Sequence, residues 1–484
     1  MNTIKNYLFM FTVFTGAFLM MLVFAGPSMS MTFADGKISL NGFYKNWTGY
    51  RFGAWGEERG DGLSIFRNTL QLETEIQLKD RMSFVGIYRF SREPAYELEE
   101  EAREAGNFDA DILDESDFRE YYLDWQATRR LWFGIGKQQV VWGDLGGLGL
   151  RVMDIINPLD LTWHYSLEAF EDIRKPLHML NAIVSIPEIQ ANVQLVWVPG
   201  LEDTQQRVNS IFTNPGHRWG LNNVSGINQD DPGFFQKGVE EPDPFEGDAP
   251  GITRDIEDDS TVAIRFQKRS GNITWAVMDA YTHNHSPTVY VLPSGNLKIE
   301  HRRQNVFGVS ANMYDKYTNG VWRFEAGHFH DTPYTGNMFQ LVEEDTYKFG
   351  IGYDRNTFFD FLSPTRSVLT QFQILGTYIP DDDDIDVRTS VADQVNESLD
   401  IMYTLFINWG WNNDRTQINL YPAYNFDRDF GMIQAWIDWR PSEFGGDLKI
   451  TPKVNLLYGD DPWAGDFGFV RGCTEGLLEI TYEF

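Results

Sequence analysis

Apolar and polar residues alternate with a period of two along much of the chain. The segment Leu70–Leu78 shows this pattern most cleanly, and the last nine residues, Gly476–Phe484, repeat it. One face of that last segment would hold Gly476, Leu478, Ile480, Tyr482 and Phe484, and the other Leu477, Glu479, Thr481 and Glu483. Such alternation predicts β-strands with one face suited to lipid and the other, mostly polar, suited to water.

About 18 segments of this kind follow one another without an interdomain linker, which predicts one transmembrane antiparallel up-and-down β-barrel. Sixteen strands is the main alternative, because the first segment and Thr346–Asp354 alternate less cleanly. The predicted strands are Lys37–Tyr50, Leu70–Leu78, Met82–Ser91, Arg119–Gln126, Leu131–Val141, Leu177–Ile186, Gln190–Val198, Thr261–Gln267, Ile273–Thr282, Arg302–Tyr314, Val321–His330, Thr346–Asp354, Val368–Ile379, Ser398–Trp409, Gln417–Tyr424, Met432–Trp439, Leu448–Tyr458 and Gly476–Phe484.

The connections between these segments are expected to alternate between short turns and long loops. If the barrel begins in the periplasm, every short turn faces the periplasm and every long loop faces outside. Residues 199–259 form the longest loop, Tyr96–Gly106 is a candidate short helix, and Asp381–Asp384 is a run of acids. The acids either form a solvated rim or bind divalent cations that bridge to lipopolysaccharide phosphates.

The N-terminal region indicates export. Residues 1–34 combine Lys5, the charge-free and mostly apolar run Tyr7–Ala25, and small residues before a cleavage site at Ala34. This is the pattern of a signal peptide, and an uncleaved signal anchor is the alternative. After residue 34 no apolar run reaches the ~18 residues of a membrane-spanning helix. We therefore expect residues 35–484 to form a barrel in the outer membrane.

One predicted external loop, residues 142–175, has an unusually apolar composition for a solvent-exposed segment. An apolar surface of this size is expected to fold into the barrel or cover its mouth. General porins narrow their pores with a third loop in the same way. Packing on neighbouring loops, or oligomer contacts, is the alternative. The residues expected to line the constriction are Trp142, Arg151, Asp154, Asn157, Asp160, Arg174 and Lys175.

The strand faces opposite the apolar ones should line the lumen, and they carry acids on early strands and bases on later ones. These residues are Glu73, Glu75, Glu120, Asp124, Arg265, Arg302, Arg323, Lys348, Lys449 and Lys453. Facing arcs of opposite sign would create a transverse field that favours dipolar or small charged solutes. The alternative is that these charges pair with neighbours and stiffen the wall.

Five histidines map to the external ends of three adjacent strands: His283, His285, His301, His328 and His330. Grouped imidazoles can bind a transition metal, and interfacial ring packing is the competing interpretation. No other cofactor is expected. The chain lacks the Gly-x-Ser-x-Gly and His-Glu-x-x-His motifs, so we predict no enzymatic activity. Its single cysteine, Cys473, excludes an internal disulfide, and its net charge of −30 argues against nucleic-acid binding.

Two blocks beside the apolar loop carry a family resemblance. Gly136-Lys137-Gln138-Gln139-Val140-Val141-Trp142-Gly143 is followed by Asp154-Ile155-Ile156-Asn157-Pro158. Together they resemble a Gram-negative outer-membrane family of porin-like barrels whose function is unknown. The final aromatic pair, Tyr482 and Phe484, also resembles the closing strand of bacterial outer-membrane barrels, where the terminal Phe belongs to the assembly signal. Gly134, Gly136 and Gly143 should let another backbone approach closely, and Lys137 and Trp142 should anchor the loop.

We therefore predict an outer-membrane porin for passive, partly selective diffusion of small hydrophilic solutes. Some members of the resembling family are thought to work beside exporters of hydrophobic compounds. This implies a first alternative, a channel for hydrophobic or lipid-like compounds acting with periplasmic or inner-membrane partners. A scaffold that sheathes a partner protein is the second alternative. The expected partners are outer-membrane lipid, lipopolysaccharide and, through Phe484, the barrel assembly machinery, with a homo-oligomer left open.

Overall fold

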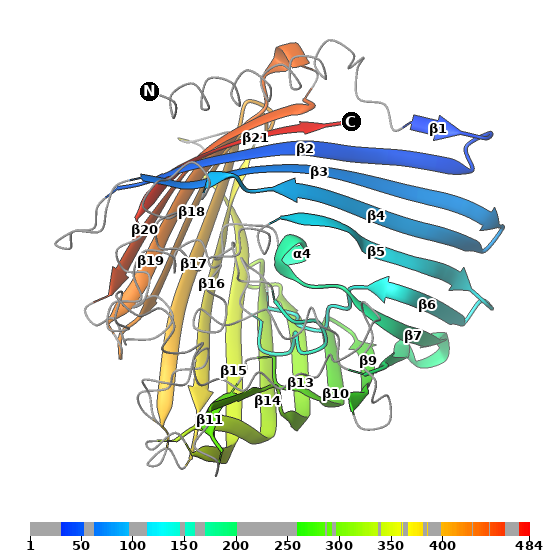
Figure 1. The fold of residues 1–484 in the computed structure, drawn as a ribbon, viewed down its shortest axis with the longest axis vertical. Coiled ribbons are helices and arrows are strands. Elements are labelled where there is room, and N and C mark those ends of the chain that lie inside the picture. The colour runs from blue at the N-terminus through cyan, green and yellow to red at the C-terminus, as the bar shows by residue number, and fades with distance from the viewer. Residues whose placement is uncertain are drawn as a thin grey trace.

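A closed β-sheet forms the body of the molecule in the computed structural model (Figure 1). The structure describes residues 31–484 with gaps at 53–61, 96–113, 146–150, 160–169, 201–258, 286–287, 293–296, 337–339, 360, 362–365, 381–384, 386–397, 428, 445 and 460–473. Within the described residues, the strands β2–β10 and β13–β21 make an antiparallel barrel of 18 strands. The fold class is therefore confirmed, and the alternative of 16 strands is wrong.

The first half of the barrel contains nine strands in sequence order. They are β2 (Ile38–Arg51), β3 (Gly62–Lys79), β4 (Met82–Arg92), β5 (Glu115–Gln126), β6 (Leu131–Gln138), β7 (Leu177–Ile186), β8 (Ala191–Val198), β9 (Thr261–Ser270) and β10 (Ile273–His283). Among the described residues of this half, the helix α4 (Phe170–Ile173) precedes β7 and the 3₁₀ turn η2 (Pro187–Ile189) follows it.

The second half continues with nine more strands. They are β13 (Arg303–Asp315), β14 (Gly320–Thr335), β15 (Leu341–Phe358), β16 (Ser367–Tyr378), β17 (Leu399–Trp411), β18 (Thr416–Asn425), β19 (Phe430–Trp439), β20 (Leu448–Gly459) and β21 (Glu475–Glu483), with the 3₁₀ turn η3 (Ser442–Phe444) before β20. A separate hairpin, β11 (Thr288–Val291) and β12 (Leu297–Glu300), lies between β10 and β13.

Strands β2 and β21 close the barrel, so neither remains an open edge. Their antiparallel register runs from Phe43 opposite Glu483 to Arg51 opposite Glu475. The backbones of Gly42 and Phe484 exchange two hydrogen bonds of 2.9 Å. Pairing every strand satisfies the backbone groups that lipid could not satisfy.

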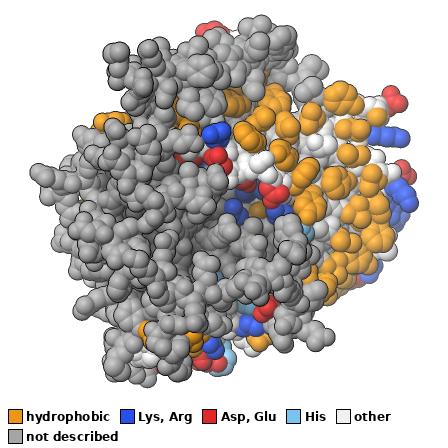
Figure 2. All heavy atoms as spheres, viewed as in Figure 1, with side chains coloured by type: hydrophobic (Ala, Val, Ile, Leu, Met, Phe, Trp, Pro, Cys, Tyr) orange, Lys and Arg blue, Asp and Glu red, His pale blue; other side chains and the backbone are white. Residues whose placement is uncertain are grey.

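Alternation along each strand sorts side chains into an apolar outer face and a largely polar inner face. On β13, Phe307 and Val309 are exposed, whereas Ser310 is buried. On β19, Ile433 is exposed and Gln434 is buried. Figure 2 shows hydrophobic side chains gathered toward the right of the molecule, with charged side chains along the right edge, where Figure 1 places the short turns next to β3, β4 and β6.

The predicted alternation of short turns and long loops agrees with the structure in part. Tight turns join β9 to β10 and β17 to β18, with left-handed backbone at Gly271 and at Asn412 and Asn413. At the opposite end, however, the connections after β14 and β18 are also short, because β15 begins at Leu341 and β19 at Phe430. The expectation that every connection at that end is long is therefore wrong at these two places.

Several predicted features lie outside the described residues. These are most of the 1–34 leader, the helix at 96–106, most of the 199–259 loop and the acids 381–384. The leader's predicted end overlaps β1 (Met31–Phe33), which pairs with β2 from Met31 opposite Leu40 to Phe33 opposite Ile38. In the described part of the chain, none of the helices has the length and apolar character needed to span a bilayer.

Candidate constriction inside the barrel

The two ends of the 142–175 segment are fastened together by Asn157. Its carboxamide accepts a hydrogen bond from the backbone N–H of Val140 (2.8 Å) and donates to the carbonyls of Gln138 (3.3 Å) and Lys175 (2.8 Å). The N–H of Lys175 in turn donates to the Pro158 carbonyl at 2.8 Å. Because Asn157 is fully buried, these bonds satisfy polar groups that water does not reach. The Asp-x-x-Asn-Pro block thus has a structural role.

A buried ion pair lies next to the hydrogen bonds of Asn157. The guanidinium of Arg174 contacts the Asp154 carboxylate at 2.5 Å, and their side chains are 1% and 3% exposed. Arg174 also donates to the side chain of Gln139 at 3.2 Å. Burial raises the pKa of the Asp154 carboxyl, and the adjacent guanidinium opposes that rise. Removing either partner would leave a buried charge without compensation.

The apolar residues of the segment pack against the inner face of the wall. Trp142, Met153, Ile155 and Ile156 are buried in one cluster with inward residues of several strands. Those wall residues are Leu177 and Met179 of β7, Val196 and Val198 of β8, Ala263 of β9, Ala276, Met278 and Ala280 of β10, Val306 of β13 and Phe329 of β14. The indole N–H of Trp142 donates to the Gln194 side chain of β8 at 3.0 Å. Burial in this cluster explains why the segment is so apolar.

Glu325 on β14 is the main polar anchor of the segment. Its carboxylate accepts hydrogen bonds from the backbone N–H groups of Asp144, Leu145 (2.6 Å) and Met153 (2.9 Å). Charged acceptors of this kind make stronger hydrogen bonds than neutral ones. Small inner-face residues provide the space, since a side chain at Gly308 would collide with Met153.

Asp144 extends the anchor to neighbouring strands. Its carboxylate lies 3.4 Å from the guanidinium of Arg265 on β9 and accepts a hydrogen bond from the Ser310 hydroxyl on β13. Its carbonyl accepts a hydrogen bond from Arg323 on β14 at 3.0 Å. The start of the segment is therefore tied to the inner faces of three strands of the wall.

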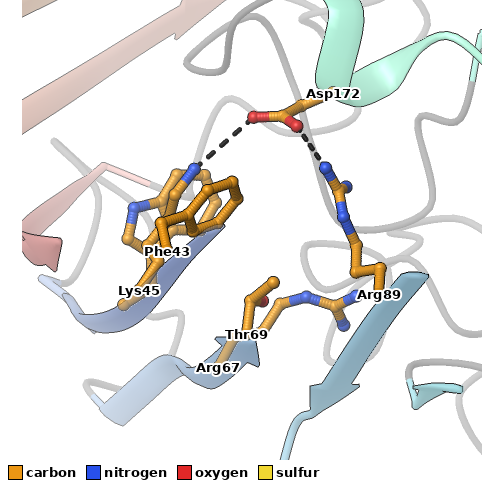
Figure 3. Close-up of a pocket in the computed structure, with 7 residues that line it drawn as sticks. Phe43, Lys45, Arg67, Thr69, Arg89 and Asp172 are labelled. Carbon is orange, nitrogen blue, oxygen red and sulfur yellow. Dashed lines mark hydrogen bonds and ion pairs between the residues drawn. The ribbon is translucent and has the colours of Figure 1, made fainter. Parts of the chain in front are cut away.

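The C-terminal end of the segment contacts other strands of the wall, β2, β4 and β5. Asp172 in α4 lies 3.5 Å from the ammonium of Lys45 on β2 and forms an ion pair with Arg89 on β4 (Figure 3). Arg119 on β5 donates to the carbonyls of Asp172 and Arg174 at 2.8 Å each. The small pocket around Asp172 is lined by Phe43, Lys45, Trp47, Arg67, Thr69, Arg89 and Asp172.

The described parts of the segment therefore contact β2, β4 and β5 at one end and β8, β9, β13 and β14 at the other. Residues 146–150 and 160–169, including Asp160, lie outside the described residues. That the whole segment narrows the lumen stays a prediction. Two other predicted members are placed locally. The Arg151 side chain packs over Gly143, and the backbone of Lys175 bonds Pro158 and Asn157. Lys137, an expected anchor, instead pairs with Asp117 of β5 at 2.7 Å.

The predicted lumen charges have nearby partners at many positions. Lys449 and Lys453 contact the buried Glu479 at 3.1 and 2.9 Å, and Arg323 contacts Asp354 at 2.5 Å. Glu479 also accepts a hydrogen bond from the Trp47 indole at 2.7 Å. At these positions the charges pair with neighbours, as in the alternative interpretation that they stiffen the wall.

The other predicted lumen residues have more varied surroundings. Gln71 donates to Glu73 at 2.7 Å, Gln139 to Glu120 at 2.8 Å and the Trp132 indole to Asp124 at 3.1 Å. The ammonium of Lys348 lies 5.1 Å from the Phe329 ring centre, and Glu75, opposite Val85, is exposed. Arg302 precedes β13 and pairs with Glu343 at 2.9 Å. That the ten predicted residues line the lumen and set its selectivity stays a prediction.

Sequence reasoning missed four residues that organise this region. Glu325 shares the inward face of Arg323, so strand parity alone could have identified it. Arg119 is brought inward by a register shift between β4 and β5, where Tyr88 pairs with Phe118 and Ile87 with Glu120. No local pattern marks such a bulge. Asp144 and Asp172 owe their roles to contacts with distant strands, which the sequence of the segment does not reveal.

The five histidines lie near the ends of β10, β13 and β14 as expected, but they do not form one group. His283 is buried, 3.6 Å from Asp259, and His301 shares a 2.9 Å hydrogen bond with the Asn284 carbonyl. Among the described residues, the ligand atoms of His328 and His330 gather with Asp345, all within 4.8 Å of one another. The sequence analysis did not single out Asp345.

Residues 56–470 match a family described as "Protein of unknown function (DUF1302)". The chain belongs to that family. This places the two sequence blocks and the 142–175 segment within the matched region, although the match does not test the blocks themselves. No curated protein matches the sequence.

The chain is similar to several solved structures of outer-membrane proteins. A BenF-like porin from Pseudomonas fluorescens Pf-5 is 7% identical, with a TM-score of 0.50, and the alignment covers 92% of this chain and 98% of that one. OccAB3 of Acinetobacter baumannii is 8% identical, with a TM-score of 0.49 and coverage of 92% and 99%. The outer membrane channel DcaP of Acinetobacter baumannii is 8% identical, with a TM-score of 0.43 and coverage of 94% and 100%. At 7% identity, the likeness to the BenF-like porin shows a shared fold alone.

Proposed function

We propose that the protein is an outer-membrane channel for the passive, partly selective diffusion of small hydrophilic solutes, narrowed by residues 142–175. One observation carries this proposal. The described parts of the segment are bonded to the inner faces of β2 and β4 through Asp172 and of β9, β13 and β14 through Asp144 and Glu325. A closed barrel of 18 strands encloses a lumen wide enough for solutes, and a segment fixed inside it would narrow that lumen.

The character of the inner wall supports a hydrophilic cargo. Buried or half-buried polar residues recur on the inner faces of β16 to β20, including Gln373, Thr404, Asn419, Gln434 and Asn455. At the other end of the segment, the pocket of Figure 3 combines Lys45, Arg67 and Arg89 with one acid, Asp172. Wall charges set ion preference in channels. We infer that the preference is set around Asp172.

Conductance in planar lipid bilayers tests the proposal. The wild-type protein should conduct ions, and deleting residues 146–163 should raise the conductance because the narrowing is removed. The substitution Glu325→Gln should also raise it, since a neutral amide holds the three N–H groups of the segment less strongly. Glu188→Gln is the matched control, because Glu188 pairs with Arg130 in the exposed turn after β7 and its loss should leave conductance unchanged.

Absence of conductance with and without residues 146–163 would overturn the porin proposal. Bound detergent together with little conductance would instead favour the channel for hydrophobic compounds. Co-purification of a stoichiometric partner protein would favour the sheathing scaffold. We also propose that a cleaved leader at residues 1–34 and recognition of Phe484 by the barrel assembly machinery deliver the chain to the outer membrane.

A further inference from the structure

A β-bulge near the end of β14 concentrates ligating side chains at one point. The register between β14 and β15 shifts from Phe329 opposite Thr346 to Thr332 opposite Glu344. His330 and Asp331 on β14 therefore both face one residue of β15, Asp345. Asp331 has a left-handed backbone with φ of 51°, a conformation that is costly for a residue other than glycine. Bulges of this kind often redirect side chains at functional positions.

This cluster lies on the outer surface of the barrel, away from the candidate constriction. The inward neighbours Glu325 and Phe329 are buried, whereas Phe324, on the same face as His328, is exposed. The ring of His328 stacks on Tyr347 with centroids 4.8 Å apart, and Tyr347 is 41% exposed. The cluster therefore faces the outside of the barrel, near the end of β14 opposite its short turn with β13, and its His330 and Asp345 side chains are 52% and 39% exposed.

Both imidazoles are directed at the same carboxylate. His328 Nε2 lies 3.2 Å from one oxygen of Asp345, and His330 Nδ1 lies 2.7 Å from the other. The remaining nitrogen of His330, Nε2, lies 3.3 Å from the Asp331 carboxylate. A histidine whose second nitrogen faces a carboxylate is the usual arrangement of a metal ligand, because the carboxylate fixes the ring and raises its basicity.

We propose that His328 Nε2, His330 Nδ1 and Asp345 bind a zinc-class divalent cation, with Asp331 positioning His330. Two imidazoles and one carboxylate form a ligand set that suits zinc. The ligand atoms already lie within 4.8 Å of one another, and bonds of about 2.0–2.2 Å to a shared ion would draw them closer together. The ion takes the place of the hydrogen bond between His330 and Asp345. Water completes the fourth position, which the exposure of the site permits.

The bound ion would join β14 to β15 across the bulge. The other three histidines, His283, His285 and His301, lie outside the described group of ligand atoms that His328, His330 and Asp345 form. The proposal thus narrows the five-histidine expectation to two histidines and adds two acids. It is independent of solute transport, because the cluster faces away from the lumen.

Metal titration of the purified full-length protein, without an affinity tag and after treatment with a chelator, tests the site. Calorimetry should detect one Zn²⁺ per chain, and Co²⁺ should give the intense visible bands of a tetrahedral complex. His330→Gln and Asp345→Asn should each weaken Zn²⁺ binding by tenfold or more. Asp331→Asn should weaken it less, by about tenfold at most, as expected for an orienting group.

His178→Gln provides the matched control. His178 lies on β7 and pairs with the Tyr121 hydroxyl, far in the sheet from β14, so its loss should leave Zn²⁺ binding unchanged. Heat-dependent gel mobility establishes that each variant is a folded barrel. Should a single variant fail to fold, the Co²⁺ spectrum of the wild type still decides the matter. Absence of saturable Zn²⁺ binding, absence of tetrahedral Co²⁺ bands, or full binding in a folded His328→Gln/His330→Gln variant would overturn the proposal.

Discussion

At the scale of single residues, the candidate constriction depends on a few buried polar groups with several partners each. Asn157 joins three backbone groups at the two ends of the segment, and Glu325 collects three N–H groups from two separate parts of it. Such groups are effective because each one fixes a backbone that has no regular secondary structure. Their removal leaves buried donors and acceptors unsatisfied.

Asn157→Ala should loosen the segment while the barrel still closes. The loss of the carboxamide leaves the Val140 N–H and two carbonyls without their partner, at a cost of about 1–3 kcal/mol. Amide hydrogen exchange across residues 139–176 should accelerate accordingly. Asn192→Ala removes a carboxamide from the barrel wall instead, where Asn192 bonds Gln267 at 3.2 Å, and should leave exchange in 139–176 unchanged. Equal exchange in both variants would contradict the role given to Asn157.

At the scale of elements, the close approach of β5 and β6 depends on Gly136. Its φ of 133° lies outside the range that other residues adopt easily, and a side chain there would collide with the backbone of Tyr121 and Tyr122. Backbone atoms of a paired strand cannot move aside. The glycine that the Gly-Lys-Gln block contains is thus required by the sheet.

Gly136→Ala should destabilise the barrel much more than Gly271→Ala. The first adds steric overlap to backbone strain, which together cost about 3 kcal/mol or more. Gly271 also has positive φ, 63°, but open space surrounds it, so its substitution should cost only about 1–2 kcal/mol. Urea unfolding followed by gel mobility would measure both. Similar midpoints would show that the close approach matters little.

The strands could be predicted from sequence because period-two alternation is a local property of each segment. All 18 predicted strands have a counterpart, and the closing pair β2 and β21 follows from the strand count. The bulges at Arg119 and Asp331 could not be predicted, because they depend on how two strands pair. The contacts of Asp144, Asp172 and Asp345 were missed for a related reason. Each partner lies on another strand or across the barrel interior, and no local pattern encodes that proximity.

At the scale of the whole molecule, the chain is strongly acidic, but many of its charged side chains form local ion pairs. The net charge is −30, yet Asp172 is the one acid among the lining residues of the Figure 3 pocket, beside Lys45, Arg67 and Arg89. Glu479 similarly faces Lys449 and Lys453. A solute inside the barrel would therefore meet a different electrostatic environment from one approaching the outer surface. Low-dielectric walls strengthen such local fields.

Asp172→Asn should shift the channel toward anions. The substitution removes one negative charge beside Lys45 and Arg89 without changing the size of the side chain, so their positive potential is no longer offset. The reversal potential across a bilayer with a KCl gradient should move toward that of chloride, and the shift should depend only weakly on salt because these side chains are buried or half-buried. Glu188→Gln is the control, since Glu188 pairs with Arg130 in the exposed turn after β7 and should not affect selectivity. An equal shift in both variants would mean that net charge, rather than the position of Asp172, sets the preference. No shift in either would place the narrowest part of the path elsewhere in the lumen.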